Sequence, residues 1–175
     1  FSSLPGAEFF ERCRIPLSNL VLRGVPEPYE ASSVAGVGLL DTPGTAAGFD
    51  QPGEVQRFLG GLDHQVSYSV VWVDGDTAVA VRLDRFAQPE GAAAFLNSEH
   101  HPAGGGSEEW AALEIPGIVQ GLIQDAPGAY LATGRVCEVV MTMHAQEGAE
   151  GGIDGGVVLD WFRDQARRIQ AAVTC

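Results

Sequence analysis

The stretch "VSYSVVWVDGDTAVAVRLDRF", residues 66–86, decides the fold class of this chain. It holds two runs rich in β-branched and aromatic residues, and between them stands "DGD" (74–76). An Asp-Gly dipeptide between two such runs is typical of a tight β-hairpin. Apolar and polar positions then alternate along the second run: Val79, Val81 and Leu83 against Ala80, Arg82 and Asp84. The alternation predicts an antiparallel sheet with one buried and one wet face.

A second hairpin and two helices extend this pattern. "AYLAT" (129–133) and "VCEVVMTMHA" (136–145) predict two more strands, joined by a two-residue turn at Gly134-Arg135. "QPEGAAAFLNSEH" (88–100) starts with proline and glutamate, as helices do, and "VVLDWFRDQARRIQAAV" (157–173) carries an apolar stripe at helical spacing. The sequence therefore predicts an α+β fold, an antiparallel sheet with helices packed on one face, with a hairpin-helix pseudo-repeat as an open alternative.

The chain is expected to form one α+β domain, residues 1–175, because 175 residues suffice for a single core. Residues 66–175 form the predicted hairpin-helix-hairpin-helix core, and residues 1–65 form an irregular N-terminal part. Within that part, residues 24–33 and 41–53 are rich in proline and glycine, which predicts loops and turns. Residues 35–40 are consistent with a short strand, and residues 54–62 with a short helix.

Charge and hydropathy exclude several classes of protein. The net charge is −13, and all ten basic residues are arginine. Such acidity argues against nucleic acid as a partner, since nucleic-acid binding needs a positive surface, and against adhesion to an anionic membrane face. No apolar run approaches the roughly 20 residues of a transmembrane helix. A signal segment or lipobox is not visible and is expected to lie outside this chain. Arginine without lysine, beside 23 glycines, is typical of a GC-rich genome such as an actinobacterial one.

The three cysteines are Cys13, Cys137 and Cys175, and no CxxC spacing signals a zinc knuckle or a redox pair. The strand 136–145 and a returning helix 157–173 span similar lengths, at about 3.3 Å and about 1.5 Å per residue. Cys175 should then return to the level of Cys137, so we expect a Cys137–Cys175 disulfide. Pairing of Cys13 with either cysteine, and three reduced thiols, stay open. A disulfide would indicate an oxidising compartment.

The segment "EHHPAGGGSEEW" (99–110) offers Glu99, His100 and His101 as candidate metal ligands. Zinc needs three or four ligands on a rigid frame. Adjacent histidines project in different directions, and the glycines at 104–106 supply flexibility. We therefore interpret this segment as a helix end followed by a surface loop, and we predict neither a metal nor a cofactor.

Known catalytic motifs are missing from the sequence. "GVGLLD" (36–41) lacks the third glycine of a dinucleotide fingerprint, a P-loop needs lysine, and no G-x-S-x-G occurs. Cys137 on an apolar strand face should be an inert thiol, His144 should be solvated, and His64 should lie in a turn. A Ser-His-Asp site assembled from distant segments stays open, because such sites ignore sequence order. Trp72 and Trp110 are the candidates for lining a binding cleft.

Two runs, "AVAVRLDRFAQPEGAAAFL" (78–96) and "EIPGIVQGLIQDAPGAYLATGRVCEVVMTM" (114–143), resemble exported actinobacterial lipoproteins and domains of unknown function. They are more loosely similar to PsbP-like lipoproteins and to extracellular sensor domains of mycobacterial serine/threonine kinases. The shared features are a strand ending at Phe86, a helix built on Phe95, and "IPG" before a hairpin with a Gly-Arg turn. The resemblance implies export, a disulfide and ligand sensing, and it carries over no catalytic residue.

These observations predict a secreted or envelope-tethered, non-catalytic domain, located outside the cell or in its envelope. Its expected partner is a small molecule or a cell-envelope protein, bound in a groove over the sheet. One alternative is a hydrolase-type enzyme with a dispersed active site, which should show convergent polar groups with shifted pKa values. The other is a structural domain that docks onto a protein, which should show a flat exposed apolar patch.

Overall fold

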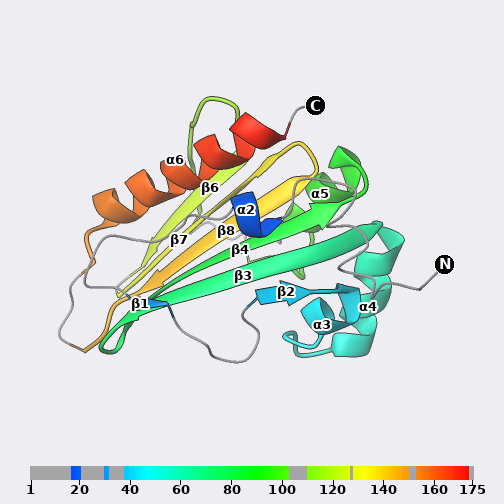
Figure 1. Cartoon of the computed structure of the whole chain (residues 1–175), viewed down its shortest axis with the longest axis horizontal. Helices are drawn as coiled ribbons and strands as arrows, with labels where there is room; N and C mark the ends of the chain where they lie inside the picture. The colour runs from blue at the N-terminus through cyan, green and yellow to red at the C-terminus, as the bar shows by residue number, and fades with distance from the viewer. Residues whose placement is uncertain are drawn as a thin grey trace.

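The computed structural model describes residues 17–20, 30–31, 38–102, 110–126, 128–149 and 153–173. Among these residues, one antiparallel sheet has the strand order β1-β3-β4-β8-β7-β6-β5, with β2 also paired to β3 (Figure 1). The strands are β1 (Glu30–Ala31), β2 (Gly38–Leu40), β3 (His64–Asp74), β4 (Thr77–Phe86), β5 (Ala111–Ala112), β6 (Val119–Ala126), β7 (Ala129–Val136) and β8 (Val139–Gln146). The helices are α2 (Leu17–Leu20), α3 (Thr42–Ala46), α4 (Pro52–Gly61), α5 (Pro89–Leu96) and α6 (Gly155–Ala172). The α+β class is confirmed.

The first hairpin forms where the sequence predicts it. Asp74 pairs with Thr77 across a two-residue turn, and Gly75 adopts a φ of 60°, which glycine accommodates without strain. The alternating apolar residues of β4 are fully buried beneath α6: Val79, Val81 and Leu83. The Asp-Gly turn and the period-2 pattern therefore fix both the register and the buried face.

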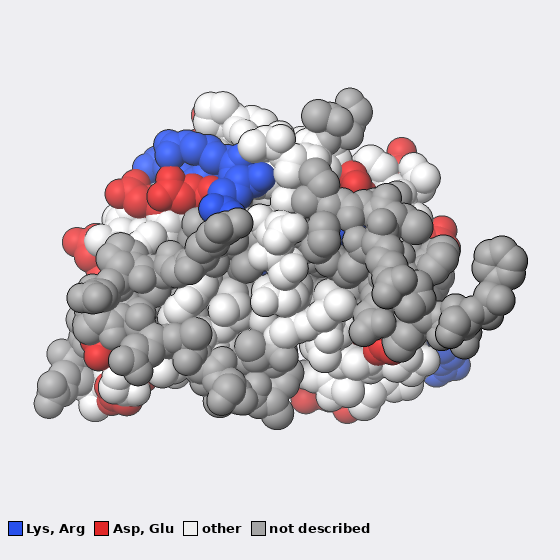
Figure 2. Space-filling model, viewed as in Figure 1, with Lys and Arg blue, Asp and Glu red and all other residues white. Residues whose placement is uncertain are grey.

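One face of the sheet packs against α6 and α2, which lie in front of it in Figure 1. The stripe of α6 is buried as predicted: Val158, Phe162, Ala166 and Ile169. The outer side of α6 carries the ion pairs Asp160–Arg163 and Asp164–Arg167, so acidic and basic side chains lie side by side along it (Figure 2). This face forms the larger core.

The opposite face packs against α3, α4 and α5. Val140 lies between Val139 and Met141, which both belong to the larger core, so strand alternation directs Val140 to the other face. There it joins a second core: Ala46, Val55, Leu59, Phe86, Ala92, Phe95 and Leu96. The helices thus cover both faces, whereas the sequence predicts them on one. The hairpin-helix units repeat in element order, but α5 and α6 lie on opposite faces.

The second hairpin turns three residues later than predicted. β7 continues through Gly134, Val136 pairs with Val139, and the turn falls at Cys137-Glu138, where Cys137 has a φ of 52°. A Cβ at Gly134 would lie 2.6 Å from Cγ2 of Ile118 and 3.3 Å from Cα of Gly121. The glycine therefore serves the close approach of β6 and β7, and the Gly134-Arg135 turn prediction is wrong.

The proline- and glycine-rich segment 41–53 also differs from the prediction of turns alone. It contains α3, whose N-cap residue Asp41 accepts a 2.8 Å hydrogen bond from the Gly44 amide, and Pro52 begins α4. Residues 30–31, inside the predicted loop 24–33, form β1 and pair with β3. The helices in 41–53 have a physical cause, because proline suits the first helical turn as well as a loop.

Candidate functional site

A cavity of about 550 Å³ opens on the second face of the sheet. Its floor consists of residues of β4 and β8, and its walls come from the segment after α3, from α5 and from the segment after α5. The lining residues are Gly48, Phe49, Ala80, Arg82, Asp84, Phe95, Glu99, His100, His101, Pro102, Thr142 and His144. This volume falls within the range of about 300–1,000 Å³ that is typical of small-molecule sites.

Arg82 is held in place at the floor of this cavity. Its Nε and Nη2 atoms donate hydrogen bonds of 2.8–3.1 Å to the carboxylate of Asp84. The guanidinium also lies 5.3 Å from the ring centroid of Phe49, within the range of a cation–π contact. Arg82 remains 30% exposed, so one edge of an otherwise neutralised pair faces the cavity.

The Asp84 carboxylate is buried and ionised. Burial acts to raise the pKa of Asp84, but the charge of Arg82 and the hydrogen bond and charge of His64 lower it. The resulting pKa lies well below the usual range of an aspartate. Asp84 therefore serves as a fixed negative partner and carries no exchangeable proton at neutral pH.

His64, Ser67 and Asp84 meet beneath the cavity, so the Ser-His-Asp possibility can be judged by geometry. The Ser67 hydroxyl donates to Asp84 Oδ1 at 2.5 Å, and His64 Nε2 lies 3.1 Å from Ser67 Oγ and 3.5 Å from Asp84 Oδ1. His64 Nδ1 lies 2.9 Å from Thr42 Oγ1. In a hydrolytic triad the serine and the carboxylate occupy opposite ring nitrogens, whereas here both lie beside Nε2.

The burial of Ser67 also argues against a hydrolytic triad. Ser67 is 0% exposed, and its oxygen also accepts a 2.8 Å hydrogen bond from the Thr45 hydroxyl. A substrate carbonyl has no access to this oxygen in the observed conformation. His64 begins β3 and is buried, so its predicted position in a turn is wrong. The three residues form a structural network that joins α3 to the sheet.

His101 supplies a neutral polar group at the cavity. Its Nε2 atom lies 3.1 Å from Thr142 Oγ1 and 3.4 Å from Thr133 Oγ1, and its ring meets Phe95 edge-on at 5.2 Å. Burial lowers the pKa of His101 to about 4; the charge of Arg82 also lowers it and that of Asp84 opposes. The imidazole is therefore uncharged at neutral pH. His144 lies on the same floor and is accessible to solvent. Burial of part of its side chain lowers its pKa too.

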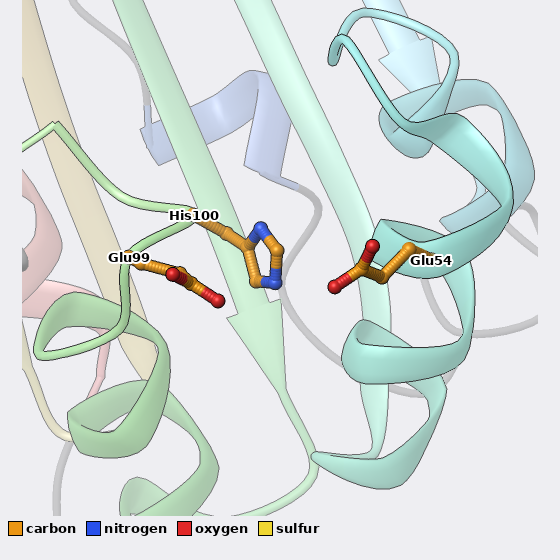
Figure 3. Close-up of side chains that lie close together, drawn as sticks. All are labelled: Glu54, Glu99 and His100. Carbon is orange, nitrogen blue, oxygen red and sulfur yellow. The ribbon is translucent and has the colours of Figure 1, made fainter.

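The candidate metal ligands separate into two groups. Glu99 and His100 lie close to Glu54 of α4, with one ligand atom from each residue within 4.8 Å of the others (Figure 3). His101 points away from this group, toward Thr142 on β8. Sequence reasoning missed Glu54, because only the folded chain brings α4 beside residues 99–100.

The tryptophans do not line the cavity. Trp72 is 5% exposed and belongs to the core beneath α6, on the face opposite the cavity, which corrects its prediction as a cleft residue. Trp110 is half-buried just before β5 and is not among the cavity residues. Cys137 is buried and disulfide-bonded. The expected pairing with Cys175, and the Cys13 alternative, fall outside the described residues.

Comparisons with known proteins give one weak likeness. No family model matches the chain, and a search of curated proteins finds no significant match. Among solved structures, the extracellular domain of PknH from Mycobacterium tuberculosis is similar, with a TM-score of 0.42 and 14% identity over 86% of this chain and 94% of that one. The lipoprotein and PsbP-like parts of the resemblance stay expectations. No helix in the described ranges is long and apolar enough to cross a membrane.

Proposed function

We propose that this chain is a non-catalytic, exported or envelope-tethered domain that binds a small molecule in the cavity over β4 and β8. The observation that carries this proposal is the cavity itself, about 550 Å³ in volume, with aromatic walls and a polar floor. Apolar walls with a few fixed polar groups are the usual composition of ligand sites, because burial supplies affinity and hydrogen bonds supply orientation.

The lining indicates the chemistry of the ligand. Phe49 and Phe95 favour a flat apolar body, while Thr142 and the exposed His144 offer hydrogen bonds. Arg82 and Asp84 offset each other's charge, and the net charge of the chain is −13, so an anionic ligand would be repelled at long range. We therefore propose an uncharged ligand with a planar apolar part and hydrogen-bonding groups at one edge.

Two observations support the non-catalytic and exported parts of the proposal. Asp84 and His101, the two cavity residues discussed above whose pKa values are strongly lowered, each have fixed hydrogen-bond partners. Ser67 is inaccessible. The disulfide-bonded state of Cys137 favours an oxidising compartment. A hydrolase is the second candidate, favoured by the proximity of His64 to Ser67, and labelling of Ser67 tests it below.

A fragment screen followed by NMR chemical-shift mapping tests the proposal. Uncharged aromatic fragments should shift the amides of β4, β8 and residues 99–102 in the unmodified chain. Ala80→Trp, which fills the cavity, should abolish these shifts. The matched control is Ala78→Trp, on the same strand face but outside the cavity lining, and should retain them. Shifts that survive in Ala80→Trp, or the absence of any hit, would overturn the proposal in favour of a protein partner.

A further inference from the structure

We propose that Glu54, Glu99 and His100 bind a divalent transition-metal ion, zinc being the best match, at the edge of the ligand cavity. One potential ligand atom from each side chain lies within 4.8 Å of the other two. Ligands about 2.0–2.2 Å from a shared zinc ion lie about 3–4 Å apart, so small side-chain rotations complete the site. Figure 3 shows Glu54 facing the other two across the space between α4 and the segment after α5.

The three side chains line a second cavity. A cavity of about 350 Å³ is lined by these residues together with Phe49, Asp50, Gln51 and Val55. Asp50 thus adds a further carboxylate to the walls of the same cavity. Glu99 and His100 also line the larger cavity, so an ion held here would lie at the wall that the two cavities share.

The charges of the group also favour a cation. Over the described part of the chain, the side chains of Glu54 and Glu99 make neither a hydrogen bond nor an ion pair. Two carboxylates at this separation repel each other even when they are fully hydrated. A divalent ion would replace that repulsion with attraction to both. The imidazole of His100 adds a nitrogen ligand, so the group is more than an exposed acidic patch.

The sequence argues against a metal because it predicts a flexible loop. In the structure, however, hydrogen bonds hold the segment that carries His100. Ser98 Oγ donates to the Phe95 carbonyl at 2.7 Å, and the amide of His101 donates to the Ser98 carbonyl at 3.1 Å. On the far side of His100, the His101 ring is held at Thr142. The His100 ring itself lies 4.7 Å from the ring of Phe58 on α4. These contacts provide the supporting frame that metal ligands need.

The ligand set selects the class of ion. One imidazole and two carboxylates suit zinc, whereas calcium and magnesium prefer sites built from oxygen alone. Three protein ligands leave a fourth position for water or for an atom of a bound molecule. The proposal does not depend on the ligand cavity being occupied, because all three metal ligands are side chains of this chain.

Zinc titration of the metal-stripped, untagged full chain tests the proposal. Calorimetry and elemental analysis of the dialysed protein should give one zinc ion per chain, with calcium failing to compete. Glu54→Gln and His100→Gln should each weaken zinc binding by about tenfold or more. Glu90→Gln, an exposed acid in the first turn of α5, is the matched control and should bind zinc like the unmodified chain.

The outcomes separate cleanly. Less than one ion per chain at saturating zinc, or equal affinity in the unmodified chain, Glu54→Gln and His100→Gln, would overturn the metal site. Circular dichroism of each variant excludes loss of fold as the cause of weaker binding. No organic fragment is present in the titration, so failure of the metal site and failure of the ligand cavity are measured independently.

Discussion

Ser67 and Asp84 face each other across the β3–β4 pair, and the serine hydroxyl donates a 2.5 Å hydrogen bond to Oδ1 of the aspartate. Arg82 donates to both oxygens of the same carboxylate, and Thr45 donates to the serine oxygen. Each buried polar atom of this pair is therefore satisfied by a neighbour. The pair links α3 to the sheet beneath the floor of the cavity.

Ser67→Ala should lower the free energy of unfolding by about 1–3 kcal/mol, because the Asp84 carboxylate loses a buried donor. Urea denaturation measures this change. Ser69→Ala, two residues along the same strand face and half-buried, is the control, with an expected effect below about 0.5 kcal/mol. A serine-reactive fluorophosphonate should leave Ser67 unlabelled in the native chain. Labelling that disappears in Ser67→Ala would instead favour the hydrolase alternative.

Asp84→Asn should destabilise the chain at neutral pH by about 2–3 kcal/mol and should remove part of its acid sensitivity. The pKa of Asp84 is lower in the folded chain than its ordinary value of 3.8, so the unfolded state binds the proton more readily. Its contribution to stability is complete above that value and is lost as the pH falls below it. The urea midpoints of the two chains should therefore lie closer together at pH ~3 than at neutral pH. A constant difference at both pH values would contradict this.

The elements predicted well are those with local signals. The Asp74-Gly75 turn, the alternation along β4 and the stripe of α6 each depend on neighbours in the sequence, and all three are confirmed. The second turn, which the sequence predicts at the wrong residues, shows where local patterns fail. Gly134-Arg135 looks like a turn locally, but Gly134 is required by contact with Ile118 of the adjacent segment, and no local pattern reveals that contact.

The site depends on non-local pairing, and for that reason the sequence predicts little of it. Arg82 and Thr142 become neighbours only because β4 pairs with β8 in one register. Phe49 reaches the cavity because a segment that looks like loop contains α3. The pair Glu99-His100 is visible in the sequence, whereas its nearest partner Glu54 belongs to a helix that packs there only in the folded chain.

Gly134→Ala should destabilise the chain by about 1–3 kcal/mol, since the added methyl group would lie 2.6 Å from Ile118 and the backbone of Gly121 is also close. Gly60→Ala is the opposite case. A Cβ at Gly60, inside α4, meets nothing within 4 Å, so alanine should leave stability unchanged or raise it by up to about 1 kcal/mol. Thermal unfolding of both variants measures the contrast. Equal effects would show that β6 and β7 can separate at no cost.

The disulfide of Cys137 leads to the prediction that bears most directly on cellular location. The chain has three cysteines, so one intramolecular disulfide leaves one thiol for alkylation in protein never exposed to reductant. Mass spectrometry should find that single label, and peptide mapping should link Cys137 to Cys175. Reduction should then cost about 2–5 kcal/mol of stability.

Two serine variants identify the partner of Cys137 without mapping. If the partner is Cys175, Cys175→Ser lowers the melting temperature of the non-reduced chain and Cys13→Ser leaves it unchanged. The reverse pattern would assign the disulfide to Cys13 and overturn the placement of Cys175 beside the start of the last strand. Three alkylated thiols in the unmodified chain would remove the main support for an oxidising compartment, since a buried cysteine can persist reduced inside the cell.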